Sequence, residues 1–328
     1  MMRKKISKYI IMIAVMLVMF SLSGCGSSGS GSSSNGKILM SVSDGSDTFR
    51  ASLAEAAKKS AEEKGLTLDV VDAQSSVDIQ VAQMKKAKDE GYDGIICLPV
   101  NADTAQQLQA SAGDLPIVFC NSCPDEKNLE KDKYMFVGSS EEVAGQYQAE
   151  YVLDFFSSKN EINVILIKGE STHSATIGRT KAVKETLNNS GKQINYVFVD
   201  NADWSDSLTK EMLEVFFKTG QKYDCVISNN DSMALGAIEA LKEHGDDLSK
   251  IPVLGVDATT DGCASIEAGE MAFTVYQSAT GQGQAAIEVV AQLCAGKSAE
   301  NVEGISDDGK YVWVPFEKVD KSNVSQYK

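Results

Sequence analysis

Four adjacent side chains that can form hydrogen bonds occupy residues 228–231, with the sequence SNND. They follow an apolar run at 225–227 and precede a helical pattern at 232–243, so they connect a strand to a helix. In a parallel sheet such a connection lies at the carboxyl end of the strand, where folds of this class bind ligands. We expect Asp231 or Ser232 to cap the helix, which leaves the paired asparagines for a polar ligand.

Other side chains suited to polar recognition also follow predicted strands. Carboxylates, amides and guanidinium groups can each bridge two neighbouring hydroxyl groups, and aromatic rings can stack on the apolar face of a sugar ring. Taken singly, each residue also has a structural explanation, since an aspartate can end a strand and a phenylalanine can begin a helix core. The hypothesis of a carbohydrate site depends on all of them lying at one edge: Asp47, Phe49, Asn121, His173, Arg179, Trp204, Asn230 and Asp257.

The sequence contains little that could carry out catalysis. It has two histidines, and neither lies in a spacing typical of a Ser–His–acid arrangement. The segment GQG at 281–283 lacks the third glycine of a dinucleotide-binding loop. Cys120 and Cys123 have CxxC spacing, yet no second pair completes a zinc site, so they form either a local disulfide or two free thiols. We therefore expect a binding protein, not an enzyme, with no metal and no cofactor.

The candidate site needs a scaffold, and hydrophobic periodicity predicts one in which strands alternate with helices. Apolar runs predict strands at 37–42, 66–71, 94–98, 116–120, 134–137, 163–168, 194–199, 225–227, 252–256, 272–276 and 311–314. Helical spacing predicts helices at 49–64, 77–90, 102–112, 141–156, 175–189, 205–219, 232–243 and 281–295. Such alternation is typical of a parallel sheet covered on both faces, so the fold class is α/β.

The two halves of the chain repeat each other. The segment GYDGIICL at 91–98 matches KYDCVIS at 222–228, and LPIVFCN at 115–121 matches IPVLGVD at 251–257. In each half an apolar strand ends in asparagine or aspartate at the matching place. Two similar lobes would bring these strand ends face to face across a cleft, and clefts between domains are common ligand sites.

The first 36 residues are not expected to belong to the fold. Arg3 and three lysines precede an apolar run at 10–20, and small residues then precede Cys25. This pattern predicts a lipoprotein signal peptide at 1–24 with lipidation of Cys25, followed by a Ser/Gly-rich tether at 25–36. The folded part should therefore lie outside the cytoplasmic membrane and contact it only through the lipid anchor.

The charge of the chain argues against two classes of partner. The whole chain carries −15, and without the four basic residues of the signal peptide 27 basic residues face 46 acidic ones, a net charge of −19. An acidic surface disfavours nucleic acid and anionic lipid. It indicates a soluble protein and says little about a small neutral ligand.

Several motifs resemble the type I periplasmic sugar-binding protein family, and most closely its galactose/glucose-binding branch. They are ILIKGE at 165–170, NADW at 201–204, VISNNDSMALGA at 226–237, IPVLGVDA at 251–258 and VPFEKVD at 314–320. The resemblance implies two Rossmann-like, flavodoxin-like lobes joined by a three-strand hinge. It places the N-terminal lobe at 37–138 plus 277–308 and the C-terminal lobe at 139–276 plus 309–328, with crossings near Gly138, Gln277 and 307–310.

The same resemblance implies a role for each candidate residue. The family's sugar contacts fall on the eight residues given above, with Phe49 and Trp204 on either side of the ring, and its hinge asparagine falls on Gln277. An aromatic and an aspartate of the family fall on Ser43 and Ala175, so the sugar could differ from galactose or glucose. The segment at 157–161 lacks the oxygen ligands of the family's calcium loop.

The resemblance also implies a biological function. A monomeric, lipid-anchored receptor would capture a monosaccharide by cleft closure and deliver it to the transmembrane subunits of an ABC permease. The alternative is a sensory receptor of the same fold, which would bind a sugar-like signal and dock onto a chemoreceptor or a sensor kinase.

Overall fold

The computed structural model describes residues 36–327. The predicted signal peptide, the predicted lipidation site Cys25 and the predicted tether up to residue 35 lie outside these residues. Within the described part, no helix combines the length and the apolar character needed to cross a membrane.

The first lobe is built on a six-stranded sheet in the order β11-β5-β4-β3-β1-β2, and all neighbouring strands are parallel. The strands are β1 Lys37–Val42, β2 Thr67–Asp72, β3 Gly94–Cys97, β4 Ile117–Cys120, β5 Tyr134–Gly138 and β11 Tyr311–Trp313. Its helices are α2 Thr48–Glu63, α3 Val77–Asp89, α4 Ala105–Ala112 and α10 Ala279–Cys294, with short 3₁₀ turns at Ala102–Thr104 and Glu126–Asn128. Helices α2 and α10 pack together, and so do α3 and α4.

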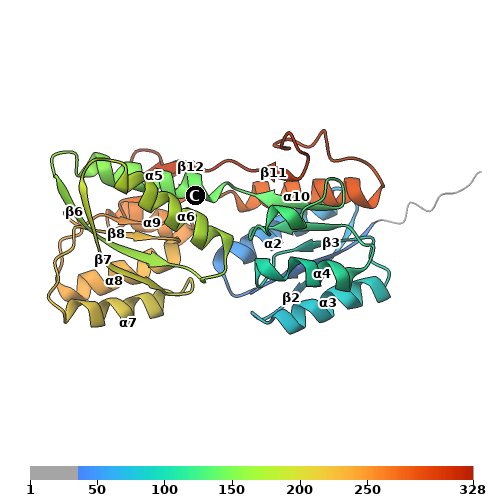
Figure 1. Ribbon diagram of the computed structural model, residues 1–328, viewed down its shortest axis with the longest axis horizontal. Helices are drawn as coiled ribbons and strands as arrows, with labels where there is room; N and C mark the ends of the chain where they lie inside the picture. Colours follow the sequence, from blue (N-terminus) through green and yellow to red (C-terminus); the bar gives the residue numbers. More distant parts are fainter. Residues whose placement is uncertain (1–35, 328) are drawn as a thin grey trace, which may run out of the picture. The chain divides into compact units, whose positions relative to one another are not determined.

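The second lobe repeats this plan with the order β12-β10-β9-β8-β6-β7. Its strands are β6 Glu161–Lys168, β7 Gln193–Asn201, β8 Cys225–Ser228, β9 Val253–Leu254, β10 Phe273–Tyr276 and β12 Glu317–Asp320, of which β12 alone is antiparallel to its neighbour. Its helices are α5 Glu141–Phe155, α6 Ser174–Asn188, α7 Asp206–Phe217, α8 Asp231–His244 and α9 Thr260–Ala268, with a 3₁₀ turn at Val324–Gln326. The elements of the two lobes form two separate groups in Figure 1.

The apolar runs in the sequence become strands that are covered on both faces. Every residue of β3, β4 and β8 is buried, because helices shield both sides of a parallel sheet. Each sheet carries a hydrophobic core on each of its two faces. The predicted α/β architecture of two Rossmann-like lobes is thus confirmed.

Two elements were missed by the sequence prediction. Helix α9 begins after Thr259, whose side chain caps it, and ends at Gly269 in the left-handed conformation, so its start and stop residues were present in the sequence. Strand β12 has a polar, largely exposed sequence, EKVD, and therefore shows no apolar run.

The predicted third crossing between the lobes is wrong. The family resemblance placed it at 307–310, but Tyr311 to Trp313 pair with β5 in the first sheet. The chain therefore leaves the first lobe only after residue 313 and enters the second sheet at Glu317. The other two crossings lie between β5 and α5 and between β10 and α10.

Candidate ligand-binding site

One pocket is lined by all of the predicted ligand-binding residues. It comprises about 280 Å³ of space between side chains of both lobes. Its lining consists of Asp47, Phe49, Arg50, Asn121, His173, Ala175, Arg179, Trp204, Asn230, Asp257 and Gln277. Ser43, where the family resemblance places an aromatic residue, is buried but does not line the pocket.

The pocket lies where the strands end. Asn121 follows β4, Asn230 follows β8 by two residues and Gln277 follows β10 directly. The backbone is strained at Asn121 and at two further pocket residues, Trp204 and Asp257. Their φ values are 66°, 67° and 119°. Non-glycine residues rarely adopt positive φ, and such strain gathers at functional sites.

The Trp204 ring lies against a glycine. A Cβ atom at Gly169 would come within 2.2 Å of the indole ring, so only glycine allows this close approach. The indole also forms a T-shaped contact with the His173 ring, with centroids 5.3 Å apart and planes at 79°. Gly169 and His173 thereby fix one aromatic wall of the pocket, while Phe49 contributes an aromatic side chain from the other lobe.

His173 joins the two lobes in a defined tautomer. Its Nδ1 atom accepts the backbone N–H of Ala175 and so caps α6. The neutral imidazole therefore carries its proton on Nε2, which donates to Oδ1 of Asn121 at 3.2 Å. Burial, followed by the charges of Arg50 and Arg179, holds the pKa of His173 well below its ordinary value. The bond also fixes the Asn121 amide, whose N–H₂ group is left for other partners.

Two further amides have their orientation fixed in the same way. Asn230 accepts the backbone N–H of Met233 through Oδ1 at 3.0 Å, so it caps α8. Gln277 accepts an N–H of Arg179 through Oε1 at 2.8 Å, and its buried Nε2 has no partner among the described residues. Because each of the three amide oxygens is held by a bond within the protein, the N–H₂ group of each amide is the part that remains unengaged and can donate to a ligand.

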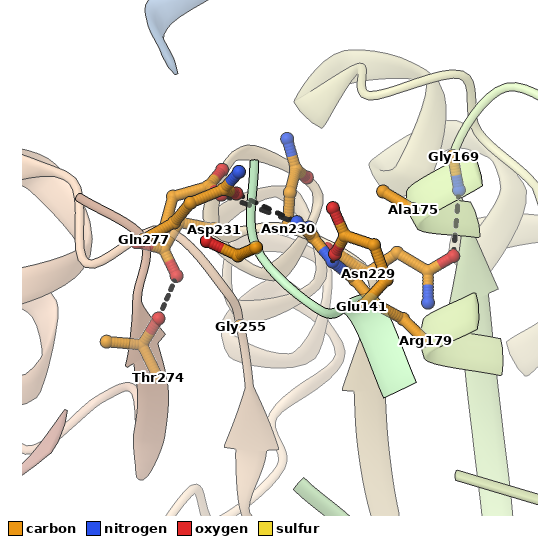
Figure 2. A network of polar contacts seen from close by, with 12 residues as sticks. Glu141, Gly169, Ala175, Arg179, Asn229, Asn230, Asp231, Gly255, Thr274 and Gln277 are labelled. Atoms are coloured by element: carbon orange, nitrogen blue, oxygen red, sulfur yellow. Dashed lines mark hydrogen bonds and ion pairs between the residues drawn. The ribbon is translucent and has the colours of Figure 1, made fainter. Parts of the chain in front are cut away.

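The prediction that Asp231 or Ser232 caps α8 is therefore wrong, since Asn230 does so. Asp231 is fully buried and accepts hydrogen bonds from Thr274 Oγ1 at 2.6 Å and from the backbone N–H of Thr259 at 2.7 Å. Figure 2 shows its bond to Thr274. Asp231 thus anchors the loop that follows Asp257, and burial raises the pKa of its carboxyl to about 6.

Asn229 forms hydrogen bonds with two groups that shape the pocket. Its Oδ1 atom accepts the backbone N–H of Gly169 at 3.2 Å, as Figure 2 shows. Its backbone carbonyl accepts an N–H of Arg179 at 2.6 Å. Asn229 thus fixes both Gly169, against which the Trp204 ring lies, and the guanidinium group of Arg179.

The acceptors of the pocket are two aspartates. Asp47 caps α2 by accepting the backbone N–H of Arg50 through one oxygen, which leaves its other oxygen available. Asp257 lies 3.9 Å from Arg179 Nη1. Burial raises the pKa of the Asp257 carboxyl well above its ordinary value despite that cation. The pocket therefore combines fixed amide donors with carboxylate acceptors. This combination suits ligand groups that both donate and accept hydrogen bonds.

Contacts between the lobes close the pocket. The Arg50 guanidinium of the first lobe lies 3.5 Å from the Glu170 carboxylate of the second, and the backbone N–H of Cys123 donates to Ser174 Oγ at 2.8 Å. The Asn121–His173 hydrogen bond is a third link. Such contacts hold the lobes together around the site.

The sequence profile of the family described as "Periplasmic binding protein domain" matches residues 38–298. This range includes every residue that lines the pocket. The chain belongs to this family. A periplasmic binding protein holds a solute without transforming it, so the chain is an extracytoplasmic binding protein and not an enzyme.

Relatives of this periplasmic binding protein differ in the solute they are named for. A candidate rhizopine-binding protein of Rhizobium meliloti is 31% identical over 266 residues, which cover 80% of this chain and 82% of the relative. The D-galactose/methyl-galactoside binding periplasmic protein MglB of Haemophilus influenzae is 31% identical over 277 residues, with the same coverage. A solved ABC transporter solute binding protein from Bacillus halodurans, with bound myo-inositol, is 29% identical. Its TM-score is 0.79, and the match covers 90% of this chain and 98% of that one.

Sequence reasoning missed several residues of the site in this binding protein. Arg50 follows the predicted Phe49 directly, yet no pattern marked it, and its partner Glu170 comes from the other lobe. Glu141, which binds Arg179, was assigned only to the start of a helix. Long-range pairs of this kind leave no trace in local spacing.

Two further features of the described residues concern the CxxC pair and metal binding. Cys120 and Cys123 carry free thiols, and burial raises the pKa of both to about 12, which makes them poor nucleophiles. Residues 36–327 contain no group of three or more His, Cys, Asp or Glu side chains arranged to hold a metal ion.

The neutral state of His173 predicts a pH-dependent stability. Its pKa is lowered in the folded protein, so the unfolded chain binds more protons once the pH falls below about 6.5. Folding free energy should then be lost by up to about 1.4 kcal/mol per pH unit. We expect His173→Asn, which retains a capping oxygen, to be less stable than wild type at pH 8, with a gap that narrows toward pH 5. Urea denaturation at these pH values measures this gap, and a gap that stays constant would contradict a neutral His173.

Proposed function

We propose that this chain is the solute receptor of an ABC importer and captures one neutral, polyhydroxylated ring by closing its two lobes. The class comprises monosaccharides, including galactose and glucose, and cyclitols. The observation that carries the proposal is the fixed polarity of the pocket: amide donors at Asn121, Asn230 and Gln277 and carboxylate acceptors at Asp47 and Asp257. A hydroxyl group can accept from an amide and donate to a carboxylate at the same time.

The charges of the pocket favour a neutral solute. Two aspartates and two arginines line it, and each arginine already pairs with a glutamate. Arg50 lies beside Glu170, and Arg179 donates to Glu141. A phosphate or carboxylate on the ligand would meet Asp47 and Asp257 without an unpaired cation, and a buried unpaired charge is costly.

Aromatic and small residues support the same class of ligand. Phe49 and Trp204 enter the pocket from opposite lobes and can contact the apolar C–H faces of a ring. Ala175 lines the pocket where the resemblance places an aspartate. Because that acceptor is absent, the preferred stereochemistry can differ from that of galactose, and the myo-inositol found in the Bacillus halodurans structure makes cyclitols a second group to test.

Transport by an ABC importer is supported by the similarity to the Bacillus halodurans protein, which is an ABC transporter solute binding protein. The lipoprotein pattern before Cys25 adds membrane anchoring to the proposal. Release of a Cys25→Ser variant from the membrane fraction would support the anchor, whereas unchanged retention would refute it.

Calorimetric titration of residues 37–328 against a panel of small solutes tests the ligand class. The panel contains D-galactose, D-glucose, D-ribose and myo-inositol, with xylitol as an acyclic control and with glucose 6-phosphate and glucuronate as charged controls. We expect at least one neutral member to bind at a one-to-one ratio with a Kd of about 10 μM or tighter, and the charged controls to bind far more weakly. Binding weaker than millimolar for every neutral member, or a preference for a charged control, would refute the proposed class.

A further inference from the structure

Arg179 contacts all three segments that connect the lobes. Its Nε donates to Glu141 Oε2 at 2.7 Å, at the start of α5 after the first crossing. Its Nη2 donates to Gln277 Oε1 at 2.8 Å, directly after β10 in the second crossing. Its guanidinium carbon lies 5.8 Å from the centroid of the Phe316 ring, directly before β12 in the third crossing. One cation therefore touches the second-lobe end of every crossing, and Figure 2 shows it with Glu141 and Gln277.

The contact between Arg179 and Glu141 is built into the packing of α5 against α6. A Cβ atom at Gly145 would lie 2.2 Å from the backbone oxygen of Arg179, and one at Gly178 would lie 2.7 Å from Cβ of Glu141. Two glycines, one on each helix, thus allow the close approach that brings the two side chains together. Both charged residues are buried, with exposures of 2% for Arg179 and 7% for Glu141.

Glu141 does not line the pocket, whereas Arg179 and Gln277 do. Arg179 uses three of its N–H groups on Glu141, Asn229 and Gln277, so two of its five remain for other partners. Gln277 has a buried Nε2 without a partner among the described residues. A solute that accepts from Gln277 or Arg179 would therefore touch the group that connects the crossings.

We propose that Glu141 is a positioning residue that couples solute binding to lobe closure, by holding Arg179 where it fixes the second-lobe ends of all three crossings. The proposal rests on the solute-capturing function given above. A ligand shifts a conformational equilibrium only through contacts that differ between the two states. On this proposal the Arg179 group supplies such a contact, since it joins the pocket to the three segments that connect the lobes.

Glu141→Gln tests this role, because it retains the size and an acceptor oxygen but removes the charge that opposes Arg179. Glu150→Gln is the matched control: Glu150 lies on the same helix and forms an ion pair with Lys318 at 2.6 Å, at the protein surface. A second variant, Phe316→Leu, removes the ring beside Arg179 and leaves both charges in place. The three variants are compared with wild type by hydrogen–deuterium exchange and by calorimetric titration.

In the solute-free protein, we expect Glu141→Gln to accelerate amide exchange in all three crossings at once, at residues 138–141, 276–279 and 313–317. Phe316→Leu should act in the same direction to a smaller extent, and Glu150→Gln should leave the crossings unchanged. A residue with a merely local structural role would affect α5 and α6 only. Faster exchange confined to these helices, or equal effects of Glu141→Gln and Glu150→Gln, would overturn the proposal.

With the tightest-binding panel member as the probe, Glu141→Gln should lower affinity by about tenfold and reduce the compaction at saturation seen by small-angle X-ray scattering. Full compaction with wild-type affinity would overturn the coupling. If no panel member binds wild type, the proposed ligand class fails, and the exchange experiment on the solute-free protein still decides whether Glu141 connects the crossings.

Discussion

Replacing Asn230 with aspartate is expected to weaken solute binding by about a hundredfold or more while the protein stays folded. The aspartate retains the oxygen that accepts the backbone N–H of Met233, and aspartate caps helices as well as asparagine does. The substitution replaces the N–H₂ donor with an anionic acceptor, which leaves a ligand oxygen opposite a carboxylate. Loss of a buried donor costs about 1–3 kcal/mol, and more when a charge is involved. Calorimetric titration and thermal unfolding measure the two effects separately.

A matched control for this variant exists in the first lobe. Asn101 caps a 3₁₀ turn by accepting the backbone N–H of Asp103 at 2.9 Å, and it does not line the pocket. Asn101→Asp makes the same chemical change and should leave affinity unaltered. Wild-type affinity in Asn230→Asp would show that the Asn230 amide does not contact the solute.

Asp257→Asn is expected to stabilise the free protein and to weaken solute binding by about a hundredfold. Burial raises the pKa of Asp257 well above its ordinary value, so the folded state binds a proton more tightly than the unfolded state does. Stability is therefore lost as the pH rises above the unfolded pKa, because the carboxylate must then be buried with its charge. The amide carries no charge and fits the same space, so the free energy of unfolding at pH 7 should rise by about 1 kcal/mol.

The same substitution removes an acceptor from the pocket and adds a donor. A ligand hydroxyl that donates to Asp257 would then face N–H₂, and the affinity would fall. Asp114→Asn, at an exposed position before β4, is the control for the loss of one negative charge. Urea denaturation and titration of both variants are decisive, and a destabilised Asp257→Asn variant with unchanged affinity would contradict the assigned role.

Much of the site could be predicted because of the topology of the parallel sheet. Asn121, Trp204, Asn230 and Asp257 each follow a predicted strand closely, and the carboxyl ends of parallel strands lie at one edge. The internal repeat between residues 91–121 and 222–257 also indicated two matching lobes. Local patterns thus identified which residues could reach one pocket.

Other features depend on contacts between distant segments. The orientation of each pocket amide depends on the residue that donates to its oxygen. This residue is Arg179 for Gln277 and His173 for Asn121. The pairing of Arg50 with Glu170 joins residues of different lobes. Strand β12 escaped prediction, and the third crossing was predicted too early in the chain, because the polar sequence EKVD becomes a strand only by pairing with β10.

The most direct test is the crystal structure of the protein in complex with the tightest-binding member of the solute panel. We predict one ring between Phe49 and Trp204, with one hydroxyl oxygen within hydrogen-bond distance of Asn230 Nδ2 and another within reach of an Asp257 carboxylate oxygen. The Glu141–Arg179–Gln277 contacts should be preserved. A solute bound outside this pocket, or one that contacts neither Asn230 nor Asp257, would contradict the proposed site and its ligand class.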